Sequence, residues 1–227
     1  MTISTCEWQE QTSGGTNWVE EQPVAPKPGY GGAGQPAWPG AAREIVILLH
    51  DPGDAGQGCD WNGKDTAGGF GWVDGDGCSV NVQNGNWVKI NTGSDTPRTC
   101  KDQLPGLVGT TVSVPVFNCI VNDRGTPTGN WEDWSPVPNC DPTTRLSGGA
   151  NSWYYIEGWA KFYVSGYQFS GDRQPSLMPG GHSVCSTAPG GGDRCLFGWF
   201  LKGELDAEAI DTSGGTDFGT FTILPAG

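Results

Sequence analysis

The sequence predicts an all-β domain, and three observations predict it. Glycine and proline are abundant, at 38 and 17 residues, whereas only 16% of the chain is charged. Leu, Lys, Glu and Ala, which fill surface helices, are scarce, while Trp, Phe, Val and Thr suit the pleated, half-buried surface of a sheet. The apolar residues gather in short runs between turn-forming clusters. We therefore expect residues 1–227 to form a single β domain with little helix, a β-sandwich or jelly-roll-like fold whose long loops are tied by disulfides.

The first third of the chain combines irregular segments with one buried strand. The opening segment, Ile3 to Trp8, is followed by a stretch without periodicity, and residues 22–42 are rich in Pro, Gly and Ala. That composition indicates an arm running over the surface. Residues 43–50 (REIVILLH) form a continuous apolar run bounded by glycine and proline. This pattern predicts a strand buried on both faces.

Later segments predict the remaining strands. Residues 78–90 predict a hairpin, because Asn-Gly between two β-like runs is the strongest short-range hairpin signal. Residues 110–117 place alternate valines on one face, and Pro115 indicates an edge strand or a bulge. Residues 195–205 and 217–224 complete the set. No fixed period recurs, so propeller and solenoid folds are not expected.

The strongest periodic signal covers residues 153–169. The face expected to lie in the core carries Tyr154, Ile156, Gly158, Ala160, Phe162 and Val164. A period of two over this length predicts one strand or a strand pair rather than a helix. Gly158 and Gly166 are the candidate positions for bulges or bends.

Eight cysteines predict a disulfide framework. They are Cys6, Cys59, Cys78, Cys100, Cys119, Cys140, Cys185 and Cys195. None forms a CxxC pair, and the two histidines do not have zinc-finger spacing, so a structural zinc site is not expected. An even number of scattered cysteines fits disulfides in an oxidising compartment, although eight cysteines allow roughly a hundred pairings. Two pairs enclose short turn-rich loops: Cys59 with Cys78, and Cys185 with Cys195.

Charge and hydropathy exclude several partners. The net charge is −13 with only 12 Lys and Arg residues, which disfavours nucleic acid and anionic membrane surfaces. No signal peptide is recognisable, and no apolar run is long enough to cross a bilayer. Because disulfides require export, we expect a targeting segment to have preceded Met1. Any membrane attachment is expected to run through a segment absent from this chain.

An acidic loop is the candidate metal site. Its ligands would be Asp60, Asn62, Asp65, Asp74 and Asp76. Closely spaced Asp and Asn in a glycine-rich loop can present hard oxygens to Ca²⁺, but the spacing is not that of an EF-hand. Asp-Gly also simply makes turns. Calcium is therefore the alternative to a structural turn, and no other cofactor is expected.

Aromatic residues form a candidate binding site, and catalytic pairs are a weaker one. Exposed tryptophans can stack on sugar rings, and tryptophans also pack beneath long loops to extend a core. The candidates for binding are Trp61, Trp72, Trp131 and Trp134. His50 and His182 could serve a nucleophilic triad, but no GxSxG elbow is present. Two carboxylate pairs are candidates for glycoside hydrolysis: Glu132 with Asp133, or Asp60 with Asp65. We therefore expect a non-enzymatic protein, with a secreted hydrolase as a distant third hypothesis.

Seven segments resemble one known family. They are ISTCEW (3–8), REIVILLH (43–50), GGFGWVDGDGC (68–78), NGNWV (84–88), GTTVSVPVFNC (109–119), YYIEGWAKFYVSGYQF (154–169) and DRCLFGWFLKGEL (193–205). Together they resemble the extracytoplasmic region of actinobacterial TadG-like (TadE/TadG) proteins of the Tad/Flp pilus assembly system. The likeness runs from Ile3 to about Leu224, and GGFGW followed by a turn and Cys is its most specific part.

The resemblance implies a location and partners. Members of that family begin with a short cytoplasmic stub, one membrane helix and an Ala-rich helical segment, none of which this sequence contains. It implies a cell-surface protein outside the cytoplasmic membrane that contacts other pilus-assembly or envelope proteins. It supplies no catalytic residues. A module that binds glycans through exposed tryptophans is the alternative.

Overall fold

The structure is a computed structural model. The residues that it describes are 2–17, 19–20, 44–48, 60–61, 64–65, 70–71, 73, 85–89, 98–122, 152–169, 171–185, 194–204, 218 and 220–221. The predicted surface arm, residues 22–42, lies outside this part of the chain.

The described chain is dominated by strands, which confirms the predicted fold class. The strands are β1 (Thr2–Ser4), β2 (Val19–Glu20), β3 (Ile45–Leu48), β4 (Asp60–Trp61), β5 (Lys64–Asp65), β6 (Phe70–Gly71), β7 (Trp87–Lys89), β8 (Thr110–Asn122), β9 (Ser152–Phe169), β10 (Asp172–Gln174), β11 (Cys195–Glu204) and β12 (Thr220–Phe221). Three short helices accompany them: α1 (Thr5–Gln11), α2 (Arg98–Lys101) and α3 (Leu104–Leu107).

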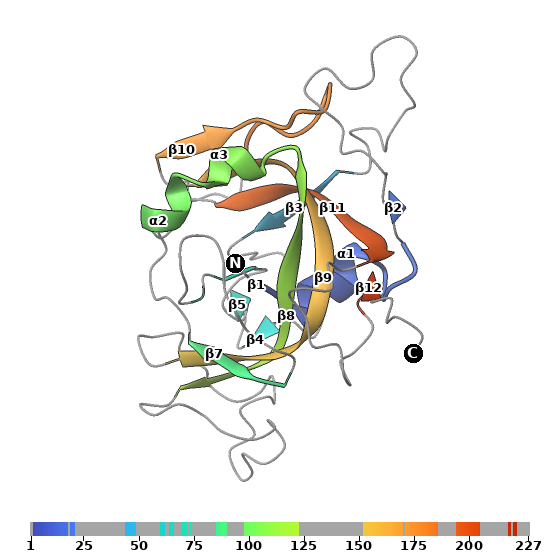
Figure 1. Cartoon of the computed structure of the whole chain (residues 1–227), viewed down its shortest axis with the longest axis vertical. Helices are drawn as coiled ribbons and strands as arrows, with labels where there is room; N and C mark the ends of the chain where they lie inside the picture. Colours follow the sequence, from blue (N-terminus) through green and yellow to red (C-terminus); the bar gives the residue numbers. More distant parts are fainter. Residues whose placement is uncertain are drawn as a thin grey trace, which may run out of the picture.

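The long strand β9 organises the sheet. β8 pairs with it antiparallel along one edge, while β11 and β7 pair with successive parts of the other edge. β8 continues to β1 and β6, and β11 pairs in turn with β3, β2 and β12. The described part thus contains a ten-stranded mixed sheet and a separate β4–β5 pair. Figure 1 shows β8, β9 and β11 as long curved strands at its centre.

Three shifts of register interrupt the regular pairing of β9. Phe197 of β11 pairs with Gly166, but the next pair joins Gly198 to Val164, so Ser165 has no partner in β11. The other two shifts are against β8: one lies beside Gly158, and the next lies between Phe117 and Cys119 of β8. An extra residue in one strand of an antiparallel pair bends that strand and re-aims its side chains. Both glycines predicted as bulge positions therefore flank bulges.

The bulge at Ser165 reverses which residues of β9 face the main core. The core-facing residues of β9 are Ala160, Phe162 and Val164 before the bulge, and Tyr167 and Phe169 after it. Even-numbered positions thus give way to odd-numbered ones. The predicted core face is confirmed for Ala160, Phe162 and Val164, and after the bulge the main core takes the odd-numbered positions instead.

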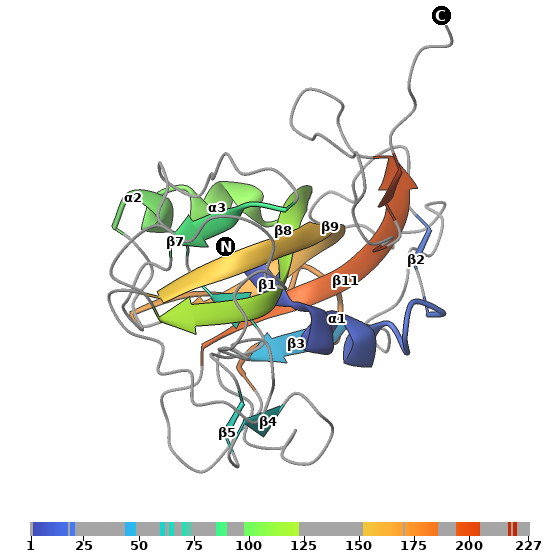
Figure 2. The ribbon, with the colours of Figure 1, turned by 90° about the horizontal axis from the view of Figure 1, so that it is seen from below.

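The main core lies between one face of the sheet and the three helices. Its helical members are Trp8 of α1, Cys100 of α2 and Leu104 of α3. Trp8 also contacts Phe218 edge to face, with ring centroids 4.9 Å apart, which joins α1 to the segment before β12. Figure 2 shows α2 and α3 on one side of the long strands, and α1 near β11 and β3. Residues from all three helices therefore belong to one core.

The opposite face of the sheet is also covered, which the sequence pattern did not predict. Residues 175–185, which we call the covering loop, pass over β9 and β11. Met178 of this loop packs with Tyr163 and Trp199. Desolvation raises the pKa of Tyr163 to about 12. Both faces of β9 are therefore interior in this region.

Strand β3 packs on both faces, as predicted. Ile47 lies in the main core, whereas Leu48 packs with Phe197 on the opposite side of the sheet. In β8, Pro115 lies one residue before the pairing with β1 begins at Val116. β8 therefore lies between β1 and β9 at Val116 and Phe117, and its register against β9 shifts directly after Val116. At Pro115 the pairing with Trp159 is regular and β9 is the described strand partner, so the edge-strand alternative fits better than a bulge at this residue.

Helix α1 was not predicted, because its apolar pattern is too short to show a helical period. Ser4 caps it: the Ser4 hydroxyl accepts a hydrogen bond from the Glu7 backbone N–H at 3.1 Å. Ser4 followed three residues later by Glu7 matches the capping-box spacing, with an acidic residue in the first turn. The helix ends before Ser13, which has a φ of 51°. A capping signal of this kind could have predicted the helix.

Strand β7 lies where the second strand of the predicted hairpin was expected, and the hairpin pairing itself stays a prediction. Gly85 has a φ of 75°, which favours glycine, and it precedes β7 as the turn signal requires. The described partner of β7 is β9, with Trp87 opposite Tyr155. The first strand of the predicted hairpin, residues 79–82, lies outside the described residues.

Candidate functional site

A buried carboxylate joins three parts of the fold. Glu44 lies immediately before β3, and its side chain is 0% exposed. Ile45, the next residue, pairs with Gly198 of β11, which lies beside the bulge at Ser165. This pairing carries Glu44 to the place where the covering loop crosses the sheet.

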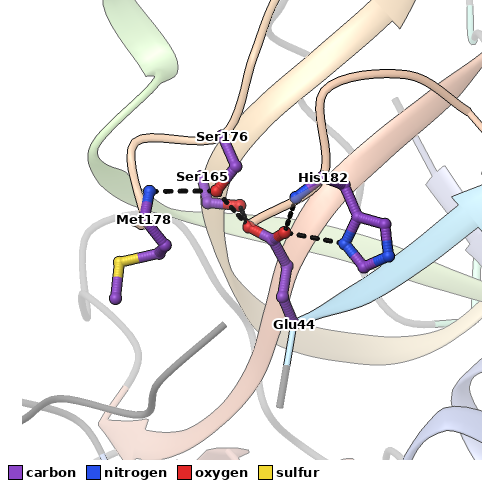
Figure 3. A network of polar contacts seen from close by, with 5 residues as sticks. All are labelled: Glu44, Ser165, Ser176, Met178 and His182. Atoms are coloured by element: carbon purple, nitrogen blue, oxygen red, sulfur yellow. Dashed lines mark hydrogen bonds and ion pairs between the residues drawn. The ribbon is translucent and has the colours of Figure 1, made fainter. Parts of the chain in front are cut away.

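Every described hydrogen bond to the Glu44 carboxylate comes from β9 or the covering loop (Figure 3). The hydroxyls of Ser165 and Ser176 donate to Oε1. The backbone N–H of His182 donates to Oε2 at 2.6 Å, and His182 Nδ1 lies 2.7 Å from the same oxygen. The Ser176 hydroxyl also accepts from Met178 N at 3.0 Å. We call Glu44 with these three donor residues the Glu44 clasp.

The clasp determines which ring nitrogen of His182 carries a proton. A carboxylate can only accept hydrogen bonds, so Nδ1 is the donor and a neutral ring leaves Nε2 as an acceptor. His182 is 40% exposed in its side chain, and its ring stacks on Phe197 with centroids 5.6 Å apart. Among the residues that the structure describes, Nε2 has no hydrogen-bond partner.

Two glycines allow the covering loop to approach this closely. A Cβ atom on Gly181 would lie 2.4 Å from Ser176 Oγ and 2.9 Å from Glu44 Oε2. A Cβ atom on Gly166 would lie 2.6 Å from the backbone oxygen of Gln174. At Gly166 the neighbouring atoms are loop backbone, so a larger residue there would push the loop away from β9; at Gly181 the side chains of Ser176 and Glu44 would have to move.

The clasp contains the residue types of a serine–histidine–acid triad but not its geometry. In a triad the hydroxyl contacts the imidazole nitrogen that the acid does not orient. Here both serine hydroxyls contact the carboxylate, on the oxygen opposite the one that His182 contacts. Each hydroxyl therefore has as its partner a carboxylate, a weaker base than the imidazole that activates a triad serine. The arrangement satisfies a buried carboxylate and attaches a loop.

The disulfide chemistry is the best-supported part of the sequence-predicted site. Cys185 and Cys195 form a disulfide, with their Cα atoms 5.7 Å apart, which confirms this pairing. Cys100 and Cys119 are also disulfide-bonded, and both are buried. None of the cysteines in the described part of the chain is free.

The other cysteine candidates are less fully described. Cys6 lies in α1, where only the course of the backbone is described. Cys59, Cys78 and Cys140 lie outside the described residues. The proposed pairing of Cys59 with Cys78 stays a prediction.

The acidic loop is described only in part. Asp60 of β4 pairs with Asp65 of β5, so the register places the two aspartates opposite each other. The remaining candidate ligands, Asn62, Asp74 and Asp76, lie outside the described residues. Within the ranges that the structure describes, no group of three or more His, Cys, Asp or Glu residues is placed to hold a metal ion. The calcium alternative stays a prediction.

The predicted aromatic and catalytic residues lie mostly outside the described residues. This holds for Trp72, Trp131, Trp134, His50 and the Glu132–Asp133 pair. Trp61 lies in β4, where only the backbone is described.

A different aromatic group is described on β7 and β9. Trp87 contacts Tyr155 edge to face, with centroids 5.1 Å apart, and the partly buried Trp153 packs against the same cluster. The exposed Lys89 pairs with Trp153 across the strands.

Sequence reasoning missed Glu44 and its serine partners. Two signals were present. Glu44 stands at the start of an otherwise apolar strand, and Ser165 interrupts the aromatic and β-branched run of β9 just before Gly166. A polar residue in a run buried on both faces needs a hydrogen-bond partner. What the sequence does not show is which segment supplies that partner, because the contacts span 121 to 138 residues.

Comparison with known proteins adds no family to this picture. No family model matches the chain, and neither a curated protein nor a solved structure gives a significant match. Within the described residues, no helix is both long and apolar enough to cross a membrane.

Proposed function

We propose that this chain is the extracytoplasmic β domain of a cell-envelope protein in a Tad/Flp-type pilus assembly system, and that it acts through protein contacts. The observation that carries the proposal is the oxidised state of its described cysteines, which include the Cys185–Cys195 bridge and the bonded Cys100 and Cys119. Disulfides of this kind persist in oxidising compartments and are rare in the cytosol.

The segments that resemble TadG-like proteins support the proposal by their place in the fold. They supply the strands β1, β3, β6, β7, β8, β9 and β11, which are joined in one sheet, and also the helix α1. The resemblance therefore rests on the residues that build the domain, rather than on a loop added to it. A family likeness confined to one short motif would have had less weight.

The geometry of the Glu44 clasp supports a role that is not enzymatic. The clasp is the group of described polar side chains most similar to a catalytic triad, yet both hydroxyls contact the acid. A protein that acts through contacts needs a rigid scaffold, and a carboxylate that accepts hydrogen bonds from two separate segments stabilises one.

Deletion of the gene in its host tests the proposal. We expect the deletion strain to lose Flp-type pili, counted by electron microscopy, and the wild-type gene to restore them. A matched pair of variants separates loss of the folded domain from loss of expression. Gly106→Ala, whose Cβ would meet nothing within 4 Å, should restore pili, whereas Gly198→Ala, whose Cβ would lie 1.8 Å from Tyr163 O, should not. Pili of normal number and length in the deletion strain would refute the proposal.

The aromatic cluster on β7 and β9 favours a second candidate, a glycan-binding module. Trp87 and Trp153 are only partly buried and lie close to Tyr155. Aromatic rings in this state can stack on sugars. Titration of the protein with cell-wall polysaccharide should then quench tryptophan fluorescence, and Trp87→Leu should weaken the effect. Fluorescence that does not change at saturating polysaccharide would exclude this candidate.

A further inference from the structure

The disulfide between Cys185 and Cys195 is flanked by a hydrogen bond that aligns its two halves. Gln168 of β9 pairs directly with Cys195 of β11. The side-chain oxygen of the same Gln168 accepts a hydrogen bond from the backbone N–H of Cys185 at 3.2 Å. One residue of the central strand thus lies opposite one cysteine and holds the backbone of the other.

The Glu44 clasp holds the covering loop a few residues earlier. His182, three residues before Cys185, donates to Glu44 through both its backbone N–H and its ring. A backbone hydrogen bond adds to this attachment, because Leu177 N donates to Ser165 O of β9 at 2.9 Å. Within the loop, Ser176 N donates to His182 O at 2.8 Å and holds its two arms together. The loop therefore has a non-covalent attachment to the sheet on the N-terminal side of the disulfide.

Both attachments depend on strands that are far apart in the sequence. Glu44 reaches the loop only when β3 is paired with β11, and Gln168 faces Cys195 only when β11 is paired with β9. The two cysteines themselves are separated by only 10 residues. A loop of that length closes rapidly in an unfolded chain, so the disulfide could in principle form with no help from the sheet.

We propose that Glu44 and Gln168 are positioning residues for oxidative folding, and that they hold Cys185 against Cys195 once β3, β11 and β9 have paired. Their effect is to select this pairing among the roughly one hundred that eight cysteines allow. Neither residue takes part in the sulfur chemistry. The inference concerns the folding of this chain and does not depend on the proposed pilus function.

The reaction that they guide is thiol–disulfide exchange with a disulfide oxidant, such as oxidised glutathione or the disulfide of a thiol oxidoreductase. The thiolate of one cysteine attacks the oxidant, and one reduced thiol leaves. The second cysteine, as its thiolate, then attacks the mixed disulfide and releases the other thiol. Two protein thiols have lost two electrons and two protons, and the oxidant has become two thiols.

Refolding of the full reduced chain in a glutathione buffer, with alkylation at timed intervals, tests the proposal. Trypsin cleaves after Arg173, Arg194 and Lys202, so the bridge joins peptide 174–194 to peptide 195–202 and mass spectrometry can count it. We expect Gln168→Leu to lower the effective concentration of the two thiols about fivefold, the equivalent of one hydrogen bond. Glu44→Gln should lower it by about tenfold or more, because several donors lose a charged acceptor.

Two further variants serve as controls. Gln168→Glu keeps an oxygen acceptor for Cys185 N–H and should restore most of the effect. Gln174→Leu changes an exposed glutamine on the neighbouring strand β10 and should behave like the wild type. The proposal is overturned if Gln168→Leu and Glu44→Gln form the linked peptides with the wild-type effective concentration, because a separation of 10 residues would then suffice.

Hydrogen exchange provides a test that needs no refolding. In a Cys185→Ala/Cys195→Ala protein, the amides of Ser176, Leu177 and His182 should remain protected, because the two attachments hold the loop without the bridge. Adding Glu44→Gln should remove that protection. If the amides already exchange freely in the double alanine protein, the disulfide holds the loop and the proposal fails.

Discussion

Replacing Glu44 by glutamine is expected to destabilise the domain while preserving its shape. The substitution is nearly isosteric, but it exchanges one of two acceptor oxygens for a donor NH₂ group. If the amide oxygen faces His182, the NH₂ group faces the hydroxyls of Ser165 and Ser176, which can rotate to accept. The network can then re-form with neutral hydrogen bonds in place of charge-assisted ones.

The magnitude follows from the number of donors. Hydrogen bonds to a charged group contribute about 1.5–3 kcal/mol each, and neutral ones about 1 kcal/mol. Weakening the contacts of Ser165, Ser176 and His182, offset by a smaller desolvation cost for a neutral group, gives a loss of about 2–3 kcal/mol. Glu44→Ala leaves the donors without an acceptor and opens a void, so it should cost about 3–5 kcal/mol.

Urea denaturation with the disulfides intact, followed by far-UV circular dichroism and tryptophan fluorescence, measures these losses. Glu10→Gln is the matched control, because Glu10 is an exposed glutamate of α1 and its change should stay within about 0.5 kcal/mol. The expected order of stability is wild type and Glu10→Gln, then Glu44→Gln, then Glu44→Ala. A Glu44→Gln midpoint equal to that of the control would refute the view that this carboxylate stabilises the fold.

Three other perturbations have expected outcomes. Gly198→Ala should lower the free energy of unfolding by more than about 3 kcal/mol, because its Cβ would lie 1.8 Å from a backbone oxygen. Gly106→Ala, whose Cβ would meet nothing within 4 Å, should be neutral or stabilising in the same urea assay. Equal urea midpoints for the two variants would contradict the packing described for β9 and β11. Folded Tyr163 keeps its proton up to about pH 12, above the pKa of the unfolded chain. The contribution of Tyr163 to the free energy of unfolding should therefore be intact below about pH 10 and fall by about 1.4 kcal/mol per pH unit as the pH rises toward 12. Tyr163→Phe should make this fall less steep. An unchanged slope of stability against pH in the variant would count against the burial of this phenol. Removing the Cys185–Cys195 bridge, which spans a separation of 10 residues, should lower the free energy of unfolding by about 2–3 kcal/mol. Reduction of all the disulfides should abolish the near-UV circular dichroism signal. A reduced protein with its native near-UV spectrum would show that the fold does not need its disulfides.

Much of the fold was predictable from local pattern. Period-two alternation predicted β9, and the glycine-bounded apolar run predicted β3, because each signal depends only on how side chains alternate along a strand. The short loop between Cys185 and Cys195 likewise suggested their pairing. Helix α1 was missed although its capping residues, Ser4 and Glu7, were visible.

The candidate site was not predictable in the same way. Nothing near Glu44 in the sequence indicates Ser165, Ser176 or His182, since each lies more than 100 residues away in the chain. Even the choice of core face in β9 changes at Ser165, where a bulge that depends on the pairing with β11 reverses the alternation.

The sequence by itself determined that this is an oxidised, strand-rich chain, because composition, alternation and cysteine number act locally or by simple count. Only the tertiary structure decided that a buried glutamate holds the covering loop and that Gln168 aligns the two cysteines. The physical reason is that strand pairing brings together groups whose distance along the chain has no bearing on their distance in space.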